Sequence, residues 1–327
     1  MNIRKFYWEA TTLTNRKQHS LKVLAELNNA LSLLEEKFDV SAAPSSSVQG
    51  STELEIKEAE GLLGRCANEL NENAKPKLRI IHHLACSGGT LISKCLSALP
   101  NVYLLSEVHP HTSLALDVNK PRYSPTDISS LAKYANIPFA NELADKIFKQ
   151  SIIAAYEHVE SLGGTLVLRD HTHADFHTSD EIPQRSTVVT LLEEHFNIQS
   201  ILTVRDPIDS YSSLVKNGWV HFEPKSFDEY CRRLLILLEQ FSADQIFSYE
   251  LFSSEPQAQV SAICQKLELP FDEAFESIFS LFNVTGDSGR KSDAISARER
   301  IAPQTIIEES EKSSFYQKFK EKYHITI

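Results

Sequence analysis

Small and hydroxyl-bearing residues follow the first strongly apolar segment of the chain. Leu78–Leu84 is typical of a buried strand, Ala85–Thr90 (ACSGGT) is a glycine turn, and helical spacing of apolar residues begins at Leu91. Where such a turn enters a helix, free backbone N–H groups and the helix dipole favour a bound anion. We therefore predict that a phosphate or sulfate binds this loop. The residues assigned to it are Cys86, Ser87, Gly88, Gly89, Thr90 and Leu91.

The loop differs from the phosphate-binding loop of nucleoside triphosphatases. That motif, G-x-x-x-x-G-K-[ST], ends with a lysine that reaches the terminal phosphates, and no lysine follows Gly89 here. A nucleotide or sugar kinase that uses ATP and Mg²⁺ is therefore disfavoured, although it stays an alternative.

Two further apolar strands end in charged residues. Thr165–Arg169 leads into Asp170 and His171, and Ile201–Val204 leads into Arg205-Asp-Pro-Ile-Asp-Ser-Tyr-Ser-Ser213. In the second segment an aspartate followed by proline predicts the start of a helix. Arg205 and Ser213 would then converge on one anionic group, which suits a phosphate. A structural ion pair of Arg205 with a neighbouring aspartate is the other interpretation.

A fourth segment, late in the chain, is rich in glycine and cations. Residues 283–292 (NVTGDSGRKS) include Gly289, Arg290 and Lys291 and follow an apolar run. Such a loop could bring two positive charges and several N–H groups over a bound anion.

The elements that would position these segments alternate along the chain from Lys77 onward. Short apolar strands that alternate with helices predict an α/β fold with a mostly parallel sheet covered on both faces. Ligands of such sheets lie beyond the carboxyl ends of the strands. The expected strands are 78–84, 102–106, 165–169, 201–204 and 245–249, and the expected helices are 90–98, 141–162, 207–217, 227–241 and 256–267.

The first 75 residues have a different pattern. Two amphipathic helical stretches are joined by a polar linker near residues 41–51, which predicts an N-terminal helical region at 1–75 and an α/β domain at 76–327. The two stretches could form a hairpin laid on the main domain or the contact of a homodimer.

The composition excludes several classes of protein. A net charge of −11 argues against a nucleic-acid partner, and no stretch approaches the ~20 apolar residues of a membrane span. The N-terminus lacks the apolar core of a secretory signal, and the five irregularly spaced cysteines form no disulfide or zinc framework. We expect a cytoplasmic protein.

The glycine turn, the Arg205–Ser213 segment and the late loop together resemble the sulfotransferases that use 3′-phosphoadenosine-5′-phosphosulfate (PAPS). In that family a strand–S-G-x-T–helix loop binds the 5′-phosphosulfate, R-[DN]-P-x-D-x-x-x-S binds the 3′-phosphate, and a late G-x-x-G-[RK] loop completes the site. The matching segments here are Cys86–Thr90, Arg205–Ser213 and Gly286–Lys291. The resemblance covers residues 77–295 and implies a P-loop-like three-layer sandwich, PAPS as co-substrate and no metal. It also implies a hydroxyl acceptor on a small molecule, lipid or carbohydrate.

The catalytic residues follow from the same resemblance. Many members carry Lys or Arg just before the Ser-Gly pair, where this chain has Ala85 and Cys86. Arg169 is the cation expected to replace it, ahead of Lys94, and the alternative is that catalysis relies on the backbone N–H groups of the loop. His171, in the position of a K-x-H base, and Glu107, which resembles the carboxylate base of other members, are the two candidates for the general base.

The run His171-Thr-His-Ala-Asp-Phe-His177 offers a metal-dependent alternative. It nearly spells the H-x-H-x-D-H motif of metallo-β-lactamase-like hydrolases, and His171, His173 and His177 would be the ligands. The inserted Phe176 changes which groups can converge, so this hydrolase is the weaker alternative. His82 and His83 are adjacent on a strand and point to opposite faces, so they cannot share a metal.

Overall fold

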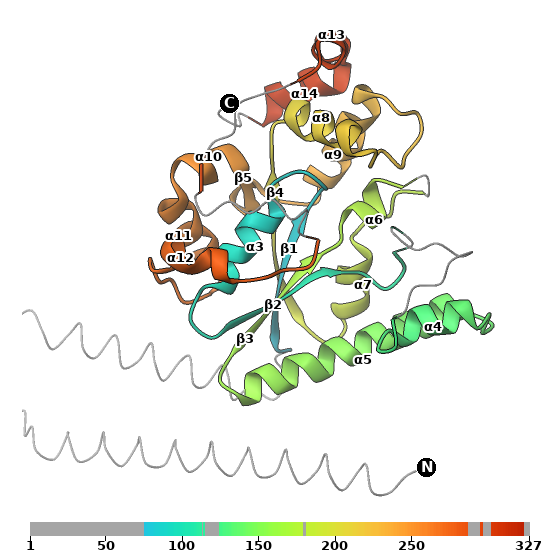
Figure 1. The fold of residues 1–327 in the computed structure, drawn as a ribbon, viewed down its shortest axis with the longest axis vertical. Coiled ribbons are helices and arrows are strands. Elements are labelled where there is room, and N and C mark those ends of the chain that lie inside the picture. Colours follow the sequence, from blue (N-terminus) through green and yellow to red (C-terminus); the bar gives the residue numbers. More distant parts are fainter. Residues whose placement is uncertain are drawn as a thin grey trace, which may run out of the picture. The chain divides into compact units, whose positions relative to one another are not determined.

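The structure, a computed structural model, describes residues 75–112, 114, 124–178, 181–286, 295–296 and 302–323. These ranges alternate strands with helices, and five parallel strands form one sheet in the order β2-β3-β1-β4-β5 (Figure 1). The strands are β1 (Lys77–His83), β2 (Val102–Val108), β3 (Thr165–Asp170), β4 (Asn197–Val204) and β5 (Ile246–Ser248). The α/β fold class predicted from the sequence is confirmed.

Helices connect and cover these strands. They are α3 (Gly89–Ser97), α4 (Ile128–Tyr134), α5 (Ala140–Ser161), α6 (His173–Phe176), α7 (Thr187–Leu192), α8 (Pro207–Asn217), α9 (Phe227–Leu238), α10 (Tyr249–Ser254), α11 (Pro256–Leu267), α12 (Phe275–Ile278), α13 (Gln304–Lys312) and α14 (Ser314–Lys322). No helix in the described ranges is long and apolar enough to cross a membrane.

Different helices cover the two faces of the sheet, because successive side chains of a strand point to opposite faces. Ile81 and Ile201 pack with α3 and α11 on one face. Ile80 and Leu168 pack with α5 and α7 on the other, where Val204 also meets α8 and α9. Helices thus lie on both faces of the sheet (Figure 1). The carboxyl ends of the strands are left as the place where residues from different strands can meet a ligand.

The elements agree closely with the expectation from the sequence. All five expected strands form, and the helices expected at 207–217 and 256–267 have those bounds in the structure. The fourth strand begins earlier than expected, at Asn197, because its polar first half pairs with β1 across the register Lys77–His83 to Asn197–Thr203. The fifth strand ends at Ser248, whose hydroxyl caps α10.

The N-terminal helical region predicted at 1–75 lies outside the described residues except for its last position. The division of the chain into this region and an α/β domain therefore stays a prediction.

Candidate functional site

The glycine loop joins β1 to α3 and needs both of its glycines. Gly88 has φ +87°, and a Cβ there would lie 2.1 Å from the Tyr249 ring. A Cβ on Gly89 would lie 2.5 Å from the His83 ring. At both positions the backbone lies so close to a ring that the side chain of any larger residue would clash with it. The turn therefore brings the first N–H groups of α3 to the carboxyl end of the central strand β1, as an anion site requires.

The hydroxyl groups of the loop already have partners. Ser87 Oγ donates to Leu84 O at 2.7 Å and so closes the turn. Thr90 Oγ1 donates to Gly286 O at 3.4 Å and accepts from Arg169 Nη2 at 3.3 Å. The amide of Leu91 donates to Gly88 O at 3.0 Å, so its N–H group is also engaged. The hydroxyl of Ser87 serves the shape of the loop, whereas that of Thr90 links it to the charged residues beyond.

Arg169, Glu107 and His171 converge beside this loop. Arg169 Nη2 lies 2.6 Å from Glu107 Oε1, and His171 Nδ1 lies 2.7 Å from Glu107 Oε2. The three come from the ends of β3, β2 and the turn after β3, which are neighbours in the sheet. Arg169 is buried at 3% exposure, so its pairing with the carboxylate forms in a region of low dielectric constant.

A β-bulge aims Glu107 into this cluster. The register between β2 and β3 shifts between Ser106 and Val108, and Glu107 itself has φ +61°. A positive φ at a residue with a long side chain is strained, and such strain is retained where the surroundings hold it. Here the carboxylate is held by its contacts with Arg169 and His171.

These contacts decide the protonation of Glu107. Burial raises the pKa of its carboxyl group, but the hydrogen-bonding imidazoles of His83 and His171 and the charge of Arg169 outweigh burial. The pKa therefore falls well below its usual range, and Glu107 is an ionised carboxylate at all physiological pH values.

His83 and His173 belong to the same cluster, and sequence reasoning did not assign them to the donor site. Arg169 Nη2 lies 2.7 Å from His83 Nε2, and the ring of His173 lies 3.7 Å from that of His171. Burial lowers the pKa of both His83 and His173, so both imidazoles are neutral at pH 7. The alternation of side chains along β1 could have predicted the place of His83. His83 points to the same face of the sheet as Ile81, and Ile81 is paired with Arg169 in the neighbouring strand.

The segment from Arg205 adjoins the glycine loop. Arg205 Nη1 donates to Cys86 O at 3.4 Å, and its guanidinium lies over the Tyr249 ring at 5.3 Å from the centroid. Asp206 caps α8, as expected, by accepting from the amide of Ile208. The glycine loop and the Arg205 segment thus meet at one place.

Arg205 and Ser213 also share one neighbour. Arg205 Nη2 lies 3.8 Å from Asp209 Oδ2, and Ser213 Oγ donates to Asp209 O at 2.9 Å. The structural ion pair predicted as the other interpretation of Arg205 is therefore present as a long contact, and Ser213 lies in the middle of α8, one turn beyond Asp209.

The start of the late loop is anchored to the cluster. Thr285 O accepts from Ser106 Oγ at 3.0 Å and from Arg169 Nη1 at 3.3 Å, and Thr285 Oγ1 donates to Ser106 O at 2.6 Å. Gly286 has φ +72°, and a Cβ there would lie 2.6 Å from Glu107 Oε1. The predicted donor-binding residues that follow, Gly289, Arg290 and Lys291, lie outside the described residues.

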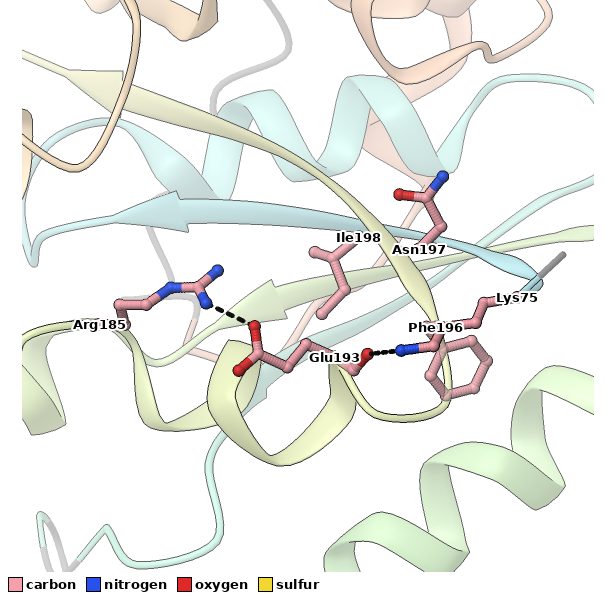
Figure 2. A pocket seen from close by; sticks show the side chains of 6 residues that line it. All are labelled: Lys75, Arg185, Glu193, Phe196, Asn197 and Ile198. Atoms are coloured by element: carbon pink, nitrogen blue, oxygen red, sulfur yellow. Dashed lines mark hydrogen bonds and ion pairs between the residues drawn. The ribbon is translucent and has the colours of Figure 1, made fainter.

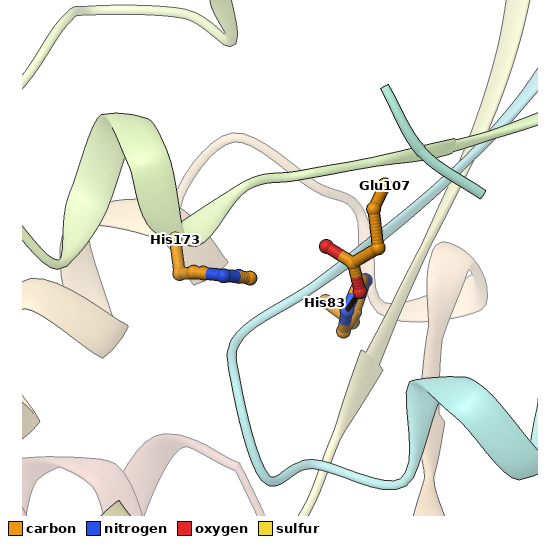
Figure 3. A group of neighbouring side chains, drawn as sticks. All are labelled: His83, Glu107 and His173. Carbon is orange, nitrogen blue, oxygen red and sulfur yellow. Dashed lines mark ion pairs between the residues drawn. The ribbon is translucent and has the colours of Figure 1, made fainter. Parts of the chain in front are cut away.

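The histidines of the metal-dependent alternative do not come together as that alternative requires. His177 packs its ring against Phe222 and Tyr230, with centroids 5.4 and 5.3 Å away. Within the described ranges, the group of side chains that could hold a metal contains His173 but takes its other donors from His83 and Glu107 (Figure 3). Phe176 and His177, at the end of α6, are both buried, so the His177 ring is part of the core.

The buried imidazole of His177 is expected to make the free energy of unfolding depend on pH. Burial and the nearby charge of Arg233 lower the pKa of its imidazole to about 3. Below pH ~6.5 the unfolded chain takes up a proton that the folded protein refuses, so the free energy of unfolding falls by ~1.4 kcal/mol per pH unit until pH ~3. His177→Leu should remove this component in urea unfolding measured from pH 7 to 4. The exposed His195 provides the control, and equal slopes for His177→Leu and His195→Leu would contradict the assignment.

A cavity of about 450 Å³ lies at the opposite, amino end of the sheet (Figure 2). Its two cations already have partners, because Lys75 Nζ donates to Glu193 O and Arg185 pairs with the Glu193 carboxylate. It lies where β4 begins, at Asn197, so it takes no part in the cluster at the carboxyl ends.

Several solved sulfotransferase structures resemble this chain at low sequence identity. Among solved structures, the chain is similar to the sulfotransferase domain from the Synechococcus PCC 7002 olefin synthase (18% identity, 76% of this chain and 96% of that chain, TM-score 0.45). It is also similar to the sulfotransferase domain from the curacin biosynthetic pathway (17% identity, 77% of this chain and 99% of that chain, TM-score 0.48). A mouse sulfotransferase, SULT7A1, solved in complex with PAP, is 11% identical over 76% of this chain and 89% of that chain (TM-score 0.37).

No curated protein matches the sequence. Residues 80–273, more than half of the chain, match the sulfotransferase family. That span runs from β1 through α11 and contains the glycine loop, Glu107, Arg169, His171 and the Arg205 segment. The chain belongs to the sulfotransferase family.

Proposed function

We propose that this protein transfers the sulfuryl group of PAPS to a hydroxyl group of a small-molecule, lipid or carbohydrate acceptor. The observation that carries the proposal is the convergence of Arg169, Glu107 and His171 beside the glycine loop at the carboxyl ends of the sheet. Membership of the family supports the reaction class, and the donor follows from what the family's motifs bind. The acceptor oxygen attacks sulfur, the bond from sulfur to the bridging phosphate oxygen breaks, and adenosine 3′,5′-bisphosphate leaves.

The donor would lie across the glycine loop and the start of α8. The N–H groups of Gly88, Gly89 and Thr90 face the 5′-phosphosulfate, and Arg205 with Ser213 takes the 3′-phosphate. By resemblance to the family's late loop, Gly289, Arg290 and Lys291, which lie outside the described residues, are proposed to bind the 3′-phosphate and adenine. The contact of Arg205 with Cys86 O supports this division, because it brings the Arg205 segment and the glycine loop together.

His171 is the general base of this proposal, and Glu107 positions it. Glu107 is a poor base because its contacts with Arg169 and the imidazoles lower the pKa of its carboxyl group. Its contact with His171 Nδ1 holds the ring in one orientation. His171 Nε2 is buried and has no hydrogen-bond partner among the described residues, so it is the atom that would take the acceptor proton.

Arg169 takes the role of the cation that many members carry at the position of Ala85 or Cys86. Its Nη2 contacts Thr90, the last residue of the glycine turn, so the guanidinium adjoins the loop that would hold the phosphosulfate. A buried guanidinium there would stabilise the negative charge that develops on the sulfuryl and bridging oxygens.

Titration of the purified protein with adenosine 3′,5′-bisphosphate, and separately with ATP and Mg²⁺, tests the donor class by calorimetry. The proposal expects micromolar or tighter binding of the bisphosphate and none of ATP. Binding of ATP alone would assign the protein to the kinase alternative, and binding of neither nucleotide would contradict a PAPS site.

Arg205→Ala should weaken binding of adenosine 3′,5′-bisphosphate by ~2 kcal/mol, about 30-fold in Kd, because it removes a charge-assisted contact with the 3′-phosphate. The matched control is Arg185→Ala, which changes an arginine at the other end of the sheet. An unchanged Kd for Arg205→Ala would remove this residue from the donor site.

Oligomeric state and cellular compartment are also part of the proposal. The helical pattern of residues 1–75 supports a separate N-terminal region through which two chains form a homodimer. Size-exclusion chromatography with light scattering tests the dimer. The four cysteines that the structure describes are free, which supports a reducing, cytoplasmic setting.

A further inference from the structure

Three side chains from three elements form a metal-type donor set at the proposed site. His83 ends β1, Glu107 lies at the bulge of β2, and His173 begins α6 (Figure 3). One donor atom from each lies within 4.8 Å of the others. His83 Nε2 and Glu107 Oε1 are 3.3 Å apart, which is about the separation of two ligands on a tetrahedral zinc ion with bonds near 2.0–2.1 Å.

The chemistry of the set suits zinc. Two imidazoles and one carboxylate with a fourth position open form a ligand set typical of exchangeable Zn²⁺ sites. His173 Nδ1 is buried and has no hydrogen-bond partner among the residues that the structure describes. A small movement of His173 would bring a nitrogen of its ring to bonding distance of an ion held by the other two residues.

Arg169 competes for this position. Its Nη2 lies 2.6 Å from Glu107 Oε1 and 2.7 Å from His83 Nε2, so the guanidinium contacts both atoms that a metal would use. If the guanidinium moved away from Glu107 and His83, it would keep three acceptors that its nitrogens already contact. These are Ser106 Oγ at 3.0 Å, Thr285 O at 3.3 Å and Thr90 Oγ1 at 3.3 Å.

We propose that His83, Glu107 and His173 bind Zn²⁺ in competition with the guanidinium of Arg169, and that zinc bound there inhibits the enzyme. Binding follows from the donor set alone. Inhibition rests on the proposed function, because zinc on Glu107 Oε1 would displace Arg169 from its place beside the glycine loop.

Titration of the full-length wild-type protein with ZnCl₂ tests the binding directly. We expect one zinc per chain at micromolar concentration, with X-ray absorption showing two imidazoles, oxygen ligands and no sulfur. A sulfur ligand would assign the ion to a cysteine and overturn the proposal, as would the absence of saturable binding.

Two substitutions with opposite expected signs separate competition from loss of structure. His173→Ala should weaken zinc binding at least tenfold, whereas Arg169→Ala should strengthen it about tenfold by removing the competitor, a change of ~1.4 kcal/mol. His195→Ala, an exposed histidine, is the matched control and should bind zinc as the wild type does. Unchanged or weaker binding in Arg169→Ala would overturn the competition, because a damaged fold does not gain affinity.

Inhibition is measured on sulfuryl transfer with zinc added and then removed by a chelator. We expect reversible loss of kcat in the wild type at zinc concentrations that match the binding curve, and a higher requirement for zinc in His173→Ala. Activation by zinc would overturn the inhibitory role. If no sulfuryl transfer is found at all, the proposed function fails, while the zinc titration still decides the binding site.

Discussion

Replacing His171 with alanine is expected to lower kcat by about 10²–10⁴-fold, while the Kd for adenosine 3′,5′-bisphosphate stays nearly unchanged. The reason is geometric: His171 Nδ1 is held by Glu107, and Nε2 is left to take the proton of the acceptor hydroxyl. Single-turnover kinetics with PAPS, together with calorimetric binding of the bisphosphate, separate the two quantities.

Glu107→Gln is the variant that distinguishes the two candidate bases. An amide keeps the size of the side chain and cannot accept a proton at neutral pH, but it can still contact His171. If His171 is the base, Glu107→Gln should retain more activity than His171→Ala. An inactive Glu107→Gln beside an active His171→Ala would reverse the assignment. His195→Ala, on the surface, should be as active as the wild type.

Arg169→Ala is expected to lower kcat by about 10²–10³-fold, the typical cost of removing a preorganised group that stabilises charge in the transition state. Arg169 is buried and contacts both the glycine loop and Glu107, so its loss also leaves a carboxylate without its cation. Arg169→Lys should restore part of the rate, because a lysine keeps the charge but loses the bidentate geometry.

Thermal unfolding must accompany this measurement, since an unpaired buried carboxylate destabilises a fold. The double variant Arg169→Ala/Glu107→Gln removes both charges and should recover stability without recovering kcat. Full activity in the stable double variant would show that the loop N–H groups suffice and that Arg169 has no catalytic role.

Most of the fold could be predicted from the sequence because its signals are local. Buried parallel strands are short apolar runs, and α8 carries its own start signal in Asp206-Pro207 and its end at Gly218, which has φ +70°. The sequence does not predict the bounds of a polar strand segment such as the first half of β4, because pairing with β1 and not composition makes those residues extended.

The residues of the proposed site also fall into two groups, those that the sequence could locate and those that it could not. Glu107, Arg169, His171 and Arg205 stand directly at strand ends, so the rule for ligands of parallel sheets located them in the sequence. His83 and His173 could not be placed by that rule alone. One belongs to a pair of adjacent histidines and the other to a histidine run, and only the direction of each side chain decides that His83 contacts Arg169 and that His173 stacks on His171.

The sequence by itself determined the alternation of strands and helices, the glycine turn and the order of the motifs, because each depends on residues close together in the chain. Only the tertiary structure decided which groups meet. The strand order β2-β3-β1 brings the ends of three strands together, and the bulge at Glu107 turns a carboxylate toward Arg169 and His171. Ionisation follows from that meeting, since the pKa of a buried carboxyl group is set by neighbours that are distant in sequence.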